Sequence, residues 1–147
     1  EKSNEQNKKI IYNFFIKNIK ALNNWDLVDV TVPKVMGDYL KDKNRKILYD
    51  YAKSNNLWKK RISILATSPL IREKNYKDVL AISKILLLDK HDLIHKAVGW
   101  MLREVGKRDT KLLYIFLDQN IRKIPRTTLR YAIERFPENI RKAYLKK

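Results

Sequence analysis

The sequence predicts an all-α fold, a helical-repeat solenoid formed by one domain of residues 1–147. The chain has only 3 Gly and 4 Pro in 147 residues, too few for a turn-rich all-β protein. Apolar residues recur at helical spacing along almost the whole chain, and no segment of useful length alternates as a strand does. A helical unit also recurs roughly every 30–40 residues, which is typical of a solenoid.

Ten helices are expected from this apolar spacing, and polar or proline-containing breaks separate them. The breaks fall at Asn23-Asn24, Pro33, Asn55-Asn56, Ser68-Pro69, Pro125 and Pro137. The expected helices are 7–22, 25–32, 34–41, 44–54, 57–67, 75–88, 91–106, 109–119, 126–136 and 138–146.

The repeat is marked by similar segments at regular intervals. Pro33 and Pro69 lie 36 residues apart, and each closes a short helix that begins near a tryptophan, in WDLVDVTVP and WKKRISILATSP. Further shifts of about 36 and about 31 residues reach HKAVGWMLREVGK and TTLRYAIERF. We interpret these units as HEAT-like or related helical pairs, in which equivalent positions form a continuous groove. A compact helical bundle is the alternative.

The charge of the chain is strongly positive. The 33 Lys and Arg against 16 Asp and Glu give a net charge of +17. Such an excess suits a nucleic-acid partner if the cations gather on one face among aromatic residues. Lysines enriched by an AT-rich genome would scatter instead.

Several protein classes are excluded by the composition. The chain has no Cys, so disulfide frameworks, thiol nucleophiles and cysteine metal sites are excluded. No apolar run reaches the ~18 residues of a membrane span, so no membrane partner is expected. The start EKSNEQNKK lacks the apolar segment of a signal peptide and an initiator Met, which suggests a trimmed or partial chain.

Helix 91–106 contains the clearest candidate for an interaction surface. Lys96, Trp100, Arg103 and Lys107 fall within a sector of about 60°, outside the apolar arc of that helix. Cations suit a phosphate backbone and a flat ring suits a sugar or base. The alternative is a tryptophan that caps the edge of the core beside solvated lysines. The apolar arc consists of Leu93, Ile94, Ala97, Val98, Met101, Leu102 and Val105.

Helix 57–67 places Arg61 in the middle of its apolar face, where a charge is costly without a partner. Two arrangements would satisfy it. Arg61 could form a structural ion pair with a carboxylate, or it could line a groove and bind a phosphate bidentately. Arg61 also lies 36 residues after Trp25, in register by the proline spacing, which favours the groove.

The segment NNWDLVD contains the best candidate for chemistry. Trp25 and Asp29 are neighbours at i, i+4, whereas Asp26 points about 100° away. A carboxylate repels DNA, so its place in a basic groove would be explained by stabilising a developing cation or orienting water. The alternatives are that Asp26 or Asp29 caps the helix, that either pairs with Arg61, or that Trp25 packs in the core.

The remaining candidates are weaker. Arg126 and Arg130 are spaced i, i+4, and they could either contact further phosphates or belong to a solvated face. Tyr131 is expected to pack in the core. His91 and His95 have no adjacent Glu and no obvious third ligand, so no metal site is expected. Three glycines also cannot build a phosphate-binding loop.

Four runs of this sequence resemble one known family in their order and spacing: NNWDLVDVTVPKVMGDYL, LWKKRISIL, HKAVGWMLREVGK and RTTLRYAIERF. The chain resembles the DNA alkylation repair (AlkD-like) family of HEAT-like-repeat DNA glycosylases. The resemblance covers roughly Trp25 to Phe136, and WDLVD and KAVGWMLRE are its most specific parts. Because family members are longer at the N-terminus, it implies that this chain lacks N-terminal repeats of the full family fold.

The resemblance implies a monofunctional glycosylase that excises N3- and N7-alkylated purines from double-stranded DNA without a metal or cofactor. In the family's motifs, Trp25 and Trp100 flank the sugar of the damaged nucleotide. The resemblance also implies that Asp29 is the catalytic carboxylate and that Arg61 binds the backbone near the lesion. We therefore expect the protein to be a monomer that lies in the cytoplasm and associates with the nucleoid.

Two other functions stay open at this point. A non-catalytic DNA-binding solenoid would share every cation with the enzyme and differ only at Asp29. A protein-scaffolding helical repeat predicts an apolar or mixed groove, whereas Lys96, Arg103 and Lys107 predict a cationic one.

Overall fold

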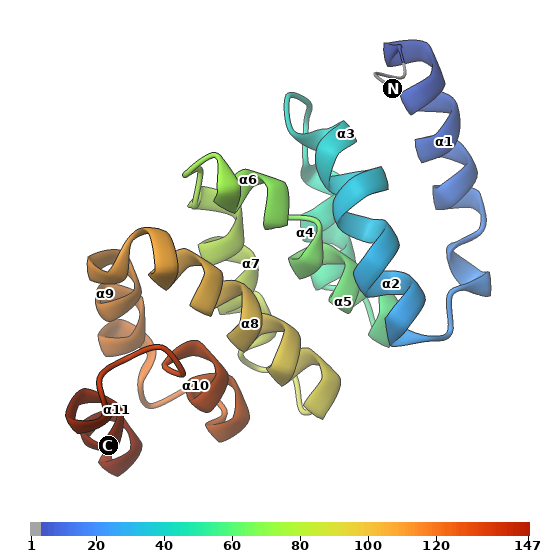
Figure 1. Ribbon diagram of the computed structural model, residues 1–147. Coiled ribbons are helices and arrows are strands. Elements are labelled where there is room, and N and C mark those ends of the chain that lie inside the picture. Colours follow the sequence, from blue (N-terminus) through green and yellow to red (C-terminus); the bar gives the residue numbers. More distant parts are fainter. Residues whose placement is uncertain (1–3) are drawn as a thin grey trace.

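The computed structural model describes residues 4–147, and every regular element in that range is a helix (Figure 1), which confirms the all-α prediction. None of these helices combines the length and the apolar content that crossing a bilayer requires. The elements are α1 (Glu5–Lys17), the 3₁₀ helix η1 (Ile19–Ala21), α2 (Trp25–Val32), the π-helical turn η2 (Pro33–Gly37), α3 (Asp38–Leu40), α4 (Lys46–Ala52), α5 (Leu57–Leu65), α6 (Ser68–Arg72), α7 (Lys77–Leu86), α8 (Asp92–Arg108), α9 (Thr110–Asn120), α10 (Arg126–Ala132) and α11 (Glu138–Lys146).

The helices follow one another as a repeated pair (Figure 1). α2, α5, α8 and α10 form one row in which each helix contacts the next, and α4 contacts α7 in a second row. Within a repeat, α4 packs on α5 and α7 packs on α8. The apolar faces of both rows are buried between them, as the predicted helical-repeat fold requires.

Side-chain caps mark the start of three of the four helices in the first row, α2, α5 and α8. Asn24 and Asn56 each accept a hydrogen bond from a backbone N–H of the following turn, at 2.8 and 3.0 Å. A ring nitrogen of His91 does the same before α8, at 3.1 Å, and Pro125 precedes α10. Such caps satisfy N–H groups that have no partner within the helix.

The caps also define the true register of the repeats. The 36-residue spacing of the prolines predicted that Arg61 is equivalent to Trp25. This prediction is wrong, because Asn24 and Asn56 lie 32 residues apart and Arg61 is therefore equivalent to Asp29. We compare the repeats by counting five positions from the residue that precedes each first-row helix. The equivalent residues are then Asp29, Arg61, Lys96 and Arg130.

The predicted break at Pro33 is wrong. The helix that begins at Trp25 continues through Pro33, whose φ of −59° and ψ of −37° are helical, because the wider turn η2 accommodates the missing N–H of proline. The break predicted at Ser68-Pro69 lies two residues earlier, at Ala66-Thr67 between α5 and α6, so Pro69 stands in the first turn of α6. Proline fits there because the first turn of a helix does not need its N–H.

Gly99 allows α8 and α10 to approach closely. A Cβ added at Gly99 would lie 2.5 Å from Cβ of Tyr131 and 2.8 Å from the carbonyl oxygen of Thr128. The Thr128 hydroxyl donates a hydrogen bond to the carbonyl of His95 at 3.0 Å, which fixes the same crossing. Residues of α8 and α10 therefore share one surface.

Gly99→Ala should destabilise the fold by about 1–3 kcal/mol, because the added methyl group has no room between the two helices. Urea unfolding followed by circular dichroism would measure this change in the free energy of unfolding. Lys111→Ala, at an exposed position of α9, is the control and should stay within about 0.5 kcal/mol of the parent. Equal stability of all three proteins would contradict the close crossing.

Candidate functional site

A pocket of about 380 Å³ lies where α2, α5, α8 and α10 meet. Its volume falls within the range of small-molecule sites, roughly 300–1,000 Å³. Six of the nine predicted site residues line it, together with two others. The eight residues are Trp25, Asp29, Arg61, Leu93, Lys96, Trp100, Arg103 and Tyr131.

Asp29 and Arg61 form a bidentate ion pair at this pocket. Nε and an Nη of Arg61 donate to the two carboxylate oxygens of Asp29, at 2.9 and 2.8 Å. The other Nη of Arg61 donates to the carbonyl oxygen of Leu93, at 2.5 Å. The side chains are only 6% (Arg61) and 16% (Asp29) exposed, so their charges depend on each other for compensation.

This pair decides among the arrangements that the sequence left open. Arg61 is paired with a carboxylate, so in this state the bidentate edge of its guanidinium binds Asp29 and not a phosphate. Asp29 does not cap α2, because Asn24 does so. The backbone-binding role of Arg61 and the catalytic role of Asp29 stay predictions.

The two tryptophans line the pocket, and both are at least partly exposed. Trp25 is 51% exposed although it begins a helix with an apolar inner face, so it does not belong to the core. Trp100 is half-buried, packs against the edge of the core and also lines a neighbouring hollow with Arg72 and Arg108. The position of Trp100 outside the apolar arc of α8 agrees with the helical spacing of the sequence.

The cations of the pocket are paired with carboxylates. Lys96 bonds to Asp92 at 2.9 Å, and this hydrogen bond raises the pKa of Lys96 and lowers the pKa of Asp92 from their ordinary values. Arg103 of α8 pairs with Glu134, which follows α10. The predicted cationic stripe therefore exists, but carboxylates compensate it locally.

Three predicted site residues lie outside the pocket. Lys107 lines an adjacent hollow that shares Arg103, and it pairs with Glu104 at 3.2 Å. Burial alone would raise the pKa of Glu104, but hydrogen bonds from Lys107 and Arg108 lower it below the ordinary value. Arg126 donates to the carbonyl of Leu145 near the C-terminus.

Arg130, the third of these residues, is exposed on α10. It is equivalent to Lys96 in the preceding repeat, yet only Lys96 lines the pocket. None of the three residues is brought to Asp29 by the fold.

Tyr131 is a pocket residue that sequence reasoning missed. We expected it in the core, but it is half-buried and forms part of the pocket wall. The reason is the close crossing of α8 and α10, where Cβ of Tyr131 sits over Gly99. The apolar pattern of α10 carries no signal of this contact, whereas a glycine within α8 was a sign of close packing.

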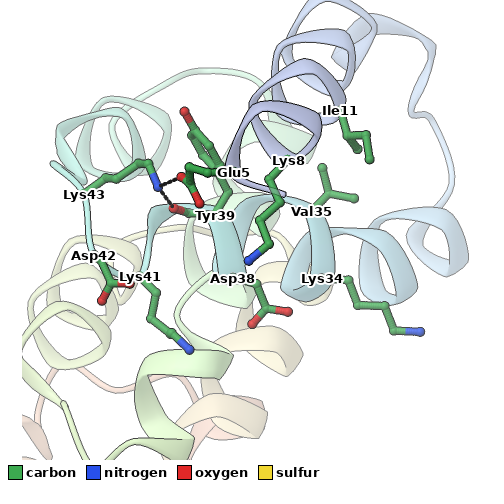
Figure 2. Close-up of a pocket in the computed structure, with 10 residues that line it drawn as sticks. All are labelled: Glu5, Lys8, Ile11, Lys34, Val35, Asp38, Tyr39, Lys41, Asp42 and Lys43. Carbon is green, nitrogen blue, oxygen red and sulfur yellow. Dashed lines mark hydrogen bonds and ion pairs between the residues drawn. The ribbon is translucent and has the colours of Figure 1, made fainter. Parts of the chain in front are cut away.

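A second pocket, of about 500 Å³, lies between α1 and the segment η2–α3 (Figure 2). Lysines and carboxylates alternate around it, and Lys43 bonds there to Glu5 at 2.5 Å and to the carbonyl of Tyr39 at 3.1 Å. It contains none of the predicted site residues.

The two histidines serve the backbone. His91 caps α8, and a ring nitrogen of His95 lies 2.6 Å from the carbonyl oxygen of Asp89. Within residues 4–147, no group of three or more His, Cys, Asp or Glu side chains is arranged to hold a metal ion.

Comparison with protein families matches residues 1–136 to the family described as DNA alkylation repair enzyme. The chain belongs to this family. The match includes every pocket residue from Trp25 to Tyr131, so membership and the pocket concern the same part of the chain. Membership in this family indicates a role in DNA repair, with DNA as the partner. A comparison with curated proteins finds no match.

Breaking the buried ion pair should strongly destabilise this DNA alkylation repair family member. Asp29→Ala and Arg61→Ala should each cost about 3–5 kcal/mol, because each leaves an uncompensated buried charge. The double variant should cost less than the sum by about 1–3 kcal/mol. Urea unfolding of all four proteins measures this coupling. The exposed pair Lys46–Asp50 is the control, and its coupling should stay below about 0.5 kcal/mol. Additive costs at Asp29 and Arg61 would contradict the pair.

Proposed function

We propose that this protein is a DNA glycosylase that excises N3- and N7-alkylated purines by hydrolysis of the N-glycosidic bond. One observation carries the proposal: a single carboxylate, Asp29, is held by Arg61 in a pocket that two tryptophans also line. The family match supports a role in the repair of alkylated DNA.

The chemistry requires little more than this arrangement. A purine alkylated at N3 or N7 carries a positive charge and is a good leaving group, so no general acid has to protonate it. The base leaves with the electron pair of the glycosidic bond, and the sugar develops oxocarbenium character. A fixed carboxylate stabilises that cation and orients the water that attacks the sugar carbon, and the proton of that water passes through the carboxylate to solvent. The faces of Trp25 and Trp100 add cation–π stabilisation.

Arg61 acts on Asp29 in this proposal. Its two hydrogen bonds hold the carboxylate in one orientation, and its third bond, to Leu93, fixes the guanidinium itself. Lys96 and Arg103, at the same pocket, are the candidate contacts to the DNA backbone.

A second candidate function is DNA binding without catalysis. The observation that favours it is the full pairing of Asp29, because both carboxylate oxygens already accept hydrogen bonds from Arg61. A guanidinium so close offsets the negative charge that an oxocarbenium ion needs. The protein would then recognise alkylated DNA and leave the bond intact.

Asp29→Asn separates the two functions. It keeps the shape of the side chain and removes its charge, so release of 7-methylguanine and 3-methyladenine from methylated DNA should fall about 10²–10³-fold. DNA affinity should hold or increase, because a negative charge near phosphates is lost. Asp26→Asn is the matched control, since Asp26 is exposed on the same helix and does not line the pocket.

Chromatography of the released bases, with circular dichroism to verify folding, measures both variants. Absence of excision by the parent protein, with tight binding to methylated DNA, would favour the non-catalytic function. Equal excision by the parent and by a folded Asp29→Asn variant would contradict the role of Asp29.

Trp100→Ala should weaken binding to DNA by about 1–3 kcal/mol, because a ring that packs against sugar or base is lost. Trp58→Ala is the matched control, since Trp58 is also half-buried against the core but does not line the pocket. Titration of a fluorescent duplex and thermal unfolding, on both variants, would compare affinity with stability. A Trp100→Ala variant with unchanged affinity and a large fall in melting temperature would place the ring in the core instead.

A further inference from the structure

Each cation that lines the pocket has a carboxylate beside it, and so does Lys107 farther along α8. The chain carries +17 overall, but at the pocket and along the adjoining part of α8 the charges compensate one another. The pairs are Arg61–Asp29, Lys96–Asp92, Arg103–Glu134 and Lys107–Glu104. A phosphate that approaches this surface therefore meets paired cations.

The pair of Arg103 and Glu134 differs from the other pairs. Lys96 and Lys107 pair within α8 at i, i+4 and i, i+3 spacing, and such surface pairs are weak. Glu134 follows α10 and reaches across to Arg103 on α8. The Arg103 side chain is 20% exposed and the Glu134 side chain 54% exposed, so packing holds the arginine while the carboxylate stays in contact with water.

Glu134 lies two residues beyond the end of α10 and does not itself line the pocket. Its carboxylate contacts an arginine that lines that same pocket.

We infer that Glu134 competes with a DNA phosphate for Arg103. In the free protein the carboxylate binds the guanidinium, and on DNA a phosphodiester oxygen replaces it while Glu134 turns to water. An arginine can bind phosphate bidentately, so the exchange conserves its hydrogen bonds. The inference rests on the proposed function in one respect, namely that the partner is DNA. Its consequence is that Glu134 keeps the affinity for undamaged DNA low.

Glu134→Gln tests this inference on an unmethylated duplex, so that excision is not needed for the readout. The neutral side chain leaves Arg103 unpaired, and affinity for the duplex should rise about three- to tenfold at moderate salt. The slope of log K against log salt should change by less than about 1, because Arg103 binds the same phosphate in both proteins. Glu138→Gln is the matched control, since it makes the same charge change on α11, away from the pocket, where Glu138 pairs with Lys142.

Fluorescence anisotropy across a salt series gives both quantities for the parent and the two variants. The inference requires that Glu134→Gln exceed Glu138→Gln in affinity, and that the gain disappear when Arg103→Gln is added. Equal effects of the two glutamine variants would overturn it, as would a gain that persists without Arg103. Duplex binding by the parent without excision of alkylated bases would instead contradict the proposed function and leave this comparison intact.

Discussion

The buried ion pair between Asp29 and Arg61 joins three successive repeats, because the guanidinium also binds the carbonyl of Leu93 at the start of α8. Two charges removed from water require this many hydrogen bonds to be tolerated. The same contacts set the distance between α2 and α8, on which the two pocket tryptophans lie. Removal of the pair would therefore affect the fold and the pocket together, and activity alone cannot report on Asp29 without a parallel measure of folding.

The three ion pairs of the pocket differ in how far water reaches them. The Asp29–Arg61 pair is nearly buried, Arg103 pairs with a carboxylate that water reaches, and Lys96 pairs on the open surface. Burial makes the first pair a fixed part of the structure, whereas solvent lowers the cost of exchanging the others. The pocket thus combines a rigid carboxylate with cations that can change partners when a polyanion arrives.

Much of this could be predicted from the sequence. Helical spacing predicts the all-α repeat fold, and six of the nine predicted site residues line one pocket. The register could not be predicted from Pro33, because that proline lies inside a continuous helix. The pairing of Arg103 with Glu134 and the place of Tyr131 depend on how α10 crosses α8 at Gly99. Such contacts between repeats leave no periodic signal within either helix.

No single helix can form the pocket without its neighbours, since the side chains that line it come from α2, α5, α8 and α10. In an array where each repeat contacts mainly the next, opening one interface leaves the remaining helices folded. The lifetime of the assembled pocket is then that of the weakest interface it spans. Heat would disperse the site by local opening while the helical content of the protein is still high.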